Sequence, residues 1–306
     1  MAATDVEIQL KKFDVSKIEP DAISVIIGKR HSGKSWLVKD ILYHKRNVFP
    51  FGMVISGTEQ MNRFYRQFSP SITIDYEYNE EKVADMLHIR QRKMAKKFRK
   101  CKEEYAKAKG YDTVDNLSRD EVREIVDTKL NPYAFLVMDD VLDKASDWNS
   151  NENIKTIFVN GRHYCIFYLL VMQYPLGIGP SLRGNVDYVF ICREPNVNNR
   201  RKLYEYWAGI FPTFDVFNTV MDQSTNNYDC LVINNRIQSN KLEDIVYWYH
   251  ADSNPAFRLC AERFWEHSDG LDQSDDDENE EEAPLDLKTY MDQRKKGPNL
   301  VVERLR

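Results

Sequence analysis

The sequence lacks the patterns that mark several classes of protein. Its five cysteines are scattered over 306 residues, and no two have the C-x-x-C spacing of a zinc ribbon or a redox pair. The longest apolar run, CIFYLLVM at 165–172, is too short to cross a bilayer, and the first residues are polar where a signal peptide would be apolar. We therefore expect a soluble, intracellular protein with reduced cysteines and no membrane span.

Catalytic patterns of hydrolases that do not use nucleotides are also missing. We find no acid cluster of a nuclease and no nucleophile–base arrangement for a protease or an acyltransferase. His31 and His163 have no metal-binding partner three or four positions further on, so a zinc or iron centre is not expected. Any catalytic or binding function must therefore rest on a different kind of motif.

Charge of one sign predominates in two stretches. Residues 90–109 hold ten Lys or Arg against two Glu, whereas residues 269–282 hold nine Asp or Glu and no base. Outside the acidic stretch the chain is mildly basic, so the net charge of −5 conceals any surface for an anionic partner. The basic residues would cover every side of a helix, and a solvated helix is at least as good an interpretation as a nucleic-acid contact.

Short apolar runs alternate with helical patterns, which is typical of an α/β protein with a parallel sheet and helices on both faces. The expected strands are 22–27, 51–56, 71–75, 134–139, 165–172, 188–193 and 229–234. The expected helices are 36–44, 80–87, 88–110, 117–130 with Ser118 as its N-cap, and 242–249.

The chain divides by pattern into a core at 1–250 and a C-terminal extension at 251–306. The two charged helices at about 88–130 are expected to form an insertion between core strands. Residues 269–283 are expected to be a disordered acidic linker, because their low hydrophobicity and high charge cannot offset the entropy of ordering.

Residues 28–35, GKRHSGKS, match the phosphate-binding pattern G-x-x-x-x-G-K-[ST], and they stand between an expected strand and an expected helix. The glycines let the backbone curl so that its N–H groups point at phosphate oxygens. Lys34 would place its charge on the β- and γ-phosphates, and the Ser35 hydroxyl would ligate Mg²⁺. The predicted nucleotide-binding residues are Gly28, Lys29, Arg30, His31, Ser32, Gly33, Lys34, Ser35 and Trp36.

Two other expected strands end in polar residues that suit ATP hydrolysis. The run 133–138 leads to Asp139, which would hold Mg²⁺ through water, and to Asp140, which would orient or deprotonate the attacking water. An Asp at the second position is also typical of a capped turn. The strand at 165–172 ends in Gln173, whose amide can donate to a γ-phosphate and accept from water; alone, it would be typical of a loop.

The order of these motifs resembles that of the poxvirus-type genome-packaging ATPases of large nucleocytoplasmic DNA viruses, a branch of the FtsK/HerA class of DNA pumps. The resemblance covers roughly residues 20–235 and rests on 28–35, VISGTE at 54–59, Asp139-Asp140, NGRHY at 160–164, MQYP at 172–175 and LRGNVDY at 182–188. It implies a RecA/FtsK-like P-loop fold with ATP and Mg²⁺ as cofactors. It also implies a homo-oligomeric ring, pentamer or hexamer, that drives double-stranded DNA into a capsid.

The same resemblance implies further partners and one more catalytic residue. A capsid or membrane-vertex protein would bind the ring, in the viral factory of the host cytoplasm or in the virion. Arg162 stands where the class has an arginine that acts on the neighbouring subunit's nucleotide, and Arg183 is a second candidate. A surface salt bridge is the alternative for either arginine. Alternatives for the whole chain are a helicase-like or DNA-partitioning ATPase, and a nucleotide-gated assembly module with little turnover.

Overall fold

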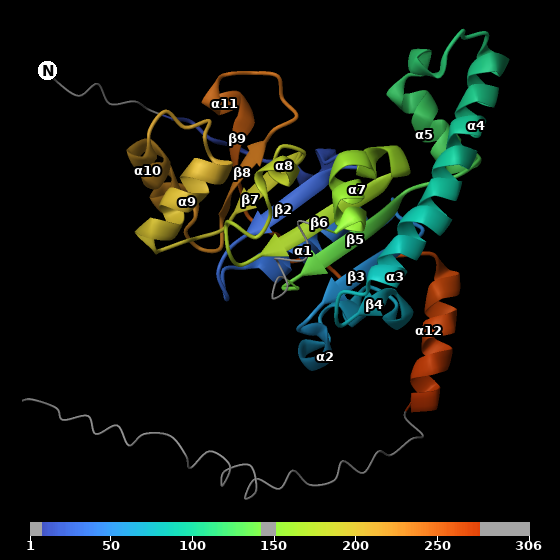
Figure 1. Cartoon of the computed structure of the whole chain (residues 1–306), viewed down its shortest axis with the longest axis horizontal. Coiled ribbons are helices and arrows are strands. Elements are labelled where there is room, and N and C mark those ends of the chain that lie inside the picture. Colours follow the sequence, from blue (N-terminus) through green and yellow to red (C-terminus); the bar gives the residue numbers. More distant parts are fainter. Residues whose placement is uncertain (1–7, 142–150, 276–306) are drawn as a thin grey trace, which may run out of the picture.

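A nine-stranded sheet forms the centre of the computed structural model, which describes residues 8–141 and 151–275 (Figure 1). The strand order is β1-β9-β8-β7-β2-β6-β5-β3-β4. Neighbouring strands are parallel except for the β7–β8 and β8–β9 pairs. The strands are β1 Lys11–Lys12, β2 Ile23–Ile27, β3 Gly52–Ser56, β4 Ile74–Asp75, β5 Ala134–Asp139, β6 Ile166–Met172, β7 Tyr188–Ile191, β8 Cys230–Asn234 and β9 Val246–Tyr249.

Helices cover both faces of this sheet, so the expected P-loop NTPase architecture is confirmed (Figure 1). The described helices are α1 Lys34–His44, α2 Glu59–Asn62, α3 Glu80–Ala84, α4 Arg92–Lys109, α5 Arg119–Thr128, α7 Glu152–Asn160, α8 Pro180–Arg183, α9 Val197–Trp207, α10 Phe214–Ser224, α11 Leu242–Ile245 and α12 Glu262–Asp275. A π-helical segment, Asp85–Gln91, joins α3 to α4. No helix in 8–141 or 151–275 is long and apolar enough to cross a membrane.

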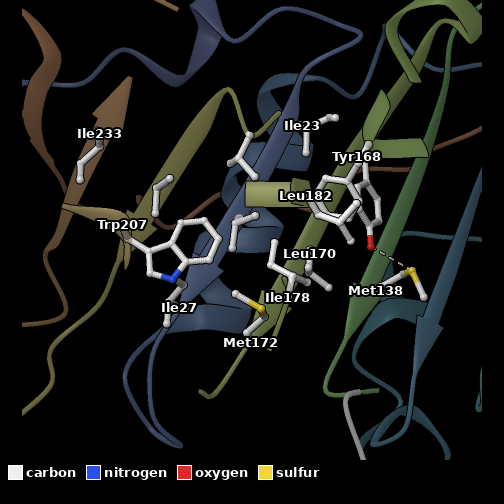
Figure 2. Packing of buried hydrophobic residues seen from close by; sticks show 14 of the residues in the cluster. Ile23, Ile27, Met138, Tyr168, Leu170, Met172, Ile178, Leu182, Trp207 and Ile233 are labelled. Atoms are coloured by element: carbon white, nitrogen blue, oxygen red, sulfur yellow. Dashed lines mark hydrogen bonds between the residues drawn. The ribbon is translucent and has the colours of Figure 1, made fainter. Parts of the chain in front are cut away.

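Alternate residues of the central strands enter two separate cores, because successive strand side chains point to opposite faces. On one face, β2 and β6 pack against α7, α8 and α9, and the indole of Trp207 lies over Ile27 (Figure 2). The Tyr168 hydroxyl donates to the sulfur of Met138 at 3.2 Å in this layer. On the other face, α1 contributes a buried apolar row at 37, 38, 41 and 42. The sheet is therefore buried on both sides, as its near-continuous apolar strands predict.

Helix α1 also carries a fully buried carboxylate, Asp40. It accepts hydrogen bonds from the Tyr249 hydroxyl at 2.5 Å, the Asp252 backbone N–H at 3.3 Å and the Asn254 side chain at 2.7 Å. The His44 Nε2 lies 3.6 Å from the same carboxylate. The helix that begins at the phosphate-binding motif is thereby fixed to β9 and to the segment that follows it.

The charged insertion folds as the helices α4 and α5, and Ser118 caps α5 as predicted. Its Oγ accepts from the Glu121 N–H, while the Glu121 carboxylate accepts from the Ser118 N–H. Phe98 and Tyr105 of α4 pack with Ile125 of α5, which orients the pair (Figure 1).

The expectation that basic residues cover every side of the first insertion helix is wrong. One face of α4 is apolar and buried, so the lysines and arginines between 92 and 100 all lie on the solvent side. Arg90 is not among them, because it precedes α4 and its guanidinium lies 4.2 Å from the Phe51 ring centroid. Burial lowers the pKa of Arg90 to about 10.

Two other element predictions need correction. The helix expected over 242–249 stops at Ile245, since the next four residues, VYWY, form β9 and complete the edge of the sheet with β8 and β1. Most of the strand expected over 71–75 is a 3₁₀ turn, and only Ile74–Asp75 pairs with β3.

The described part of the C-terminal extension packs on the core. Phe257 stacks on Phe68 with a centroid separation of 5.1 Å, and the Trp265 indole donates to the Leu259 carbonyl at 2.7 Å. Anchored in this way, α12 continues to Asp275, into the range expected as the acidic linker, because a nucleated helix extends at little cost. The rest of that linker and residues 284–306 lie outside the described residues.

Candidate nucleotide-binding site

The predicted phosphate loop, the acid pair and Gln173 lie at one edge of the sheet. In a parallel sheet the carboxyl ends of all strands share an edge, and loops there form the usual ligand sites. The phosphate loop follows β2, Gln173 follows β6, and Asp139 ends β5, with β6 lying between the other two strands. The sheet order therefore brings together the loop, the acid pair and the amide that the sequence had placed far apart.

Close packing forces the loop to begin with glycine. A Cβ atom on Gly28 would lie 2.5 Å from the Ser32 Oγ and 2.7 Å from the Cys192 Cβ, so a side chain has no room there. The Gly28 N–H donates to the Met172 carbonyl at 3.0 Å, which ties the loop to the strand that carries Gln173. Gly33, the N-cap of α1, has a φ of +89°, which glycine adopts without strain.

Lys34 lies inside the curl of the loop. Its Nζ donates to the Lys29 carbonyl at 2.7 Å, and among the described residues it forms no ion pair with a carboxylate. Burial lowers the pKa of Lys34, and the charges of Asp139 and Asp140 partly offset that shift. An ammonium group so desolvated at the amino end of α1 fits a bound phosphate, which would supply the missing negative charge.

Asp139 is a buried carboxylate with an exposed fraction of only 8%. Its Oδ2 accepts from the Tyr65 hydroxyl at 2.8 Å. Burial raises the pKa of Asp139 to about 6, although the Tyr65 hydrogen bond and the Lys34 charge oppose the shift. A carboxylate whose ionised form is disfavoured in this way fits a divalent cation, and Ser35 and Asp139 are the residues that could hold Mg²⁺.

Tyr65 is itself held in place by a residue that the sequence reasoning did not assign. Glu59 is fully buried, and its carboxylate accepts from the backbone N–H groups of Tyr65 at 2.8 Å and Arg66 at 2.9 Å. The segment after β3 therefore supports the acid at the end of β5. The only signal in the sequence was the membership of Glu59 in the VISGTE motif.

Asp140 and Gln173 are brought into direct contact. The Gln173 Nε2 donates to the Asp140 Oδ1 at 2.6 Å. Asp140 has a φ of +54°, a left-handed conformation that is uncommon for residues other than glycine. Such local strain is typical of functional positions, and the pair could orient a water molecule at the γ-phosphate end of the site.

Lys29, the second residue of the loop, has an unexpected partner beyond β7. Its Nζ lies 2.9 Å from the Glu194 Oε1, and the Glu194 side chain is almost completely buried. Glu194 also accepts from the Asn196 N–H and the Asn199 side chain. This ion pair thus fixes the phosphate loop to the segment after β7, the strand next to β2. No local sequence pattern predicts the pair.

The two candidate arginines lie away from this edge. Arg162 is exposed in the turn Gly161–Tyr164, directly before the amino end of β6, so the whole strand, about 23 Å long, separates it from Gln173. Arg183 donates to the Ile178 carbonyl at 2.7 Å, and its guanidinium lies 4.7 Å from the Tyr206 ring centroid. Arg183 therefore has partners within its own subunit, whereas Arg162 faces solvent. The structure places neither arginine at its own subunit's phosphate loop.

Arg30, His31 and Trp36 complete the rim of the loop. Their side chains are exposed, and His31 has a φ of +62°. The Trp36 ring centroid lies 5.7 Å from the Lys39 Nζ. These three predicted residues are therefore accessible from solvent.

Comparison with known proteins gives relatives in large DNA viruses. No family model matches the chain. It is 36% identical over 245 residues to the uncharacterized protein L437 of Acanthamoeba polyphaga mimivirus, an alignment that covers 80% of this chain and 78% of L437. It is 34% identical over 255 residues to protein 088R of Invertebrate iridescent virus 3, with 80% and 85% covered. Protein 015R of Frog virus 3 is 30% identical over 274 residues, with 86% and 75% covered.

Solved structures with a similar chain path are more distant. The genome packaging NTPase B204 of Sulfolobus turreted icosahedral virus 2, in complex with ATP-gammaS, has a TM-score of 0.48 and 14% identity over 76% of this chain and 98% of B204. The pCW3 conjugation coupling protein TcpA has a TM-score of 0.49 and 12% identity over 76% and 61%. By its identity to the viral relatives, this chain belongs to a family of nucleocytoplasmic large DNA virus proteins found in mimivirus and iridescent viruses, in agreement with its resemblance to the packaging ATPases of the FtsK/HerA class.

Proposed function

We propose that this protein is an ATP-driven translocase that packages double-stranded viral DNA, with ATP hydrolysed by a ring of identical subunits. One observation carries the proposal. The phosphate loop, Asp139 and the Asp140–Gln173 pair meet at one edge of the sheet, while the exposed Arg162 lies at the opposite edge. A site with these groups suits hydrolysis, and an arginine on the far edge is available only to another subunit.

Each residue has a distinct task in the proposed reaction. Lys34 and the loop N–H groups bind the β- and γ-phosphates, and Ser35 with Asp139 would hold Mg²⁺, which would supply positive charge against the phosphate oxygens. The Asp140 carboxylate orients the attacking water and accepts its proton, while the Gln173 amide fixes that carboxylate at 2.6 Å. Negative charge then grows on the γ-phosphoryl oxygens, where a planar, permanently charged guanidinium is the best donor.

Arg162 supplies this guanidinium from the neighbouring subunit, so every active site forms between two copies of the chain. A pentameric or hexameric ring satisfies this requirement at all sites. Within the ring, DNA binding through phosphates would be independent of sequence, as a packaging motor requires. A capsid or membrane-vertex protein completes the assembly in the viral factory or the virion.

The test of this function is ATP hydrolysis by the full chain with and without DNA. We expect duplex DNA to raise the rate of phosphate release several-fold, and more than single-stranded DNA of equal length. A larger effect of single strands would favour a helicase-like enzyme instead. A rate that neither form of DNA changes would favour a nucleotide-gated assembly module.

Arg162→Ala is expected to lower kcat by at least about a thousandfold and to leave ATP binding unchanged, since the arginine acts only on the neighbour's transition state. Mixing Arg162→Ala with Lys34→Ala subunits should restore part of the turnover. At mixed interfaces an intact loop then meets an intact arginine. Phosphate release, measured over a range of mixing ratios, checks this result.

Two controls test whether the effect is specific to Arg162. Arg123→Ala, which removes another exposed arginine, should retain wild-type turnover. Subunits that carry both Lys34→Ala and Arg162→Ala should give no restoration with Arg162→Ala. Full turnover by Arg162→Ala alone would show that this arginine is not the finger.

A further inference from the structure

A strained turn before β8 holds an exposed tyrosine against the phosphate loop. Tyr228 is 69% exposed, and its Cδ1 lies 3.3 Å from the position that a Cβ atom on Gly33 would take. The ring thus touches the glycine directly before Lys34. If the loop holds the phosphates as proposed, a ring beside Gly33 is close enough to contact another part of the same nucleotide.

The backbone conformation of this turn is energetically unfavourable. Asn227 has a φ of +51° and Tyr228 a φ of +68°, and a bulky residue in this left-handed region is a rare outlier. The exposed ring buries little apolar surface in return. Strain of this kind persists where function requires a side chain in one position.

Hydrogen bonds on both sides fix the turn. The Asn226 side chain donates to the Asp222 carbonyl at 2.6 Å, and the Asp229 N–H donates to the Asn226 carbonyl at 2.9 Å. The Asp229 Oδ1 lies 2.7 Å from the His250 Nδ1. Tyr228 is therefore presented by an anchored turn, and most of its surface is accessible to solvent.

We propose that the ring of Tyr228 is the platform on which the base of the bound nucleotide stacks, so that the site prefers purine nucleoside triphosphates. An aromatic ring stacks on any base, and the larger face of a purine gains more from the contact. This inference rests on the proposed function, because it names the substrate class of the same site. The alternative is that Tyr228 only shapes the loop by packing on Gly33.

The two interpretations differ for a ligand that has phosphates and no base. We would measure the Kd of ATP and of inorganic tripolyphosphate, each with Mg²⁺, by calorimetry on the full chain. Tyr228→Ala should weaken ATP binding by about tenfold to a hundredfold, the usual worth of one base–aromatic stack, and leave tripolyphosphate binding unchanged. Tyr228→Phe, which keeps the ring, should bind ATP as the wild type does. Equal losses for both ligands, or no loss for either, would overturn the proposal.

Two further variants complete the design. Tyr228→Gly suits the positive φ and still lacks the ring, so it should repeat the result of Tyr228→Ala even if alanine perturbs the turn. Tyr111→Ala, at an exposed tyrosine of the insertion, should change neither Kd. Wild-type protein that binds both ligands but shows no response to duplex DNA would overturn the translocase function alone, and the stacking result would still stand.

Discussion

Lys34→Ala is expected to reduce ATP hydrolysis by about a hundredfold to a thousandfold, the usual cost of removing one preorganised charge from a reacting phosphate. In the structure, the Lys34 ammonium lies within the loop on the Lys29 carbonyl and is partly withdrawn from water. Its charge would act on phosphate oxygens without the reorganisation that solvent requires. Affinity for ATP and for tripolyphosphate should fall together, because the lysine contacts phosphates only. Steady-state phosphate release and calorimetric titration measure the two effects.

Lys155→Ala is the matched control for this variant. Lys155 is half-buried on α7, and within 8–141 and 151–275 its ion-pair partner is Glu152 of the same helix, so its removal should leave turnover and stability unchanged. The free energy of unfolding of Lys34→Ala should not fall, because the substitution removes a desolvated charge. Turnover by Lys34→Ala close to that of the wild type would refute the phosphate-loop assignment.

The second large effect is expected for Asp139→Asn, which keeps the shape of the side chain and removes its charge. The buried Asp139 carboxylate would hold Mg²⁺, so hydrolysis should fall by about a hundredfold or more. ATP should still bind to the variant in the presence of a chelator. The gain in ATP affinity that Mg²⁺ gives the wild type should disappear, and a titration of Mg²⁺ at fixed ATP measures this gain.

Loss of folding can be separated from loss of the metal ligand. Burial raises the pKa of Asp139 to about 6, so burying its ionised carboxylate opposes folding at neutral pH, and a neutral amide should not lower the free energy of unfolding. The Tyr65 hydroxyl can still donate to the Asn oxygen. Asp120→Asn, on the exposed side of α5, serves as the control. An intact Mg²⁺ response in Asp139→Asn would assign the cation to other residues.

Features encoded within a few consecutive residues could be predicted from the sequence. The phosphate loop is a local motif, and the Gly28 contact with Ser32 and the positive φ of Gly33 both lie within it, although Cys192 also crowds Gly28 from outside. The buried strands that end in Asp139 and Gln173 were recognisable because strands covered on both faces are apolar throughout. Their meeting at one edge followed from the direction of parallel strands.

Features that depend on distant partners could not be predicted in this way. Glu194 lies far along the chain from Lys29, and nothing near either residue indicates that their side chains meet. Tyr65 contacts Asp139 because β3 lies beside β5, and because Glu59 binds the backbone of the segment that follows β3 and carries Tyr65. Tyr228 follows a helix and precedes an antiparallel strand, so no sequence pattern indicated its contact with the loop. The β9 strand was predicted as a helix, because one of its two pairing partners, β1, lies near the other end of the chain.

The buried Asp40 has a consequence for the order in which the protein can fold during synthesis. Its partners Tyr249, Asp252 and Asn254 are among the last core residues to leave the ribosome, and β1 has no neighbour in the sheet until β9 has formed. Until then, the Asp40 carboxylate lacks these three hydrogen-bond donors, although His44 of the same helix lies beside it, and burying it in the apolar layer stays unfavourable. The nascent chain should therefore remain incompletely folded, and sensitive to proteases, until residues near 254 have emerged. Such long-range closure makes folding slow relative to a helical protein of the same size.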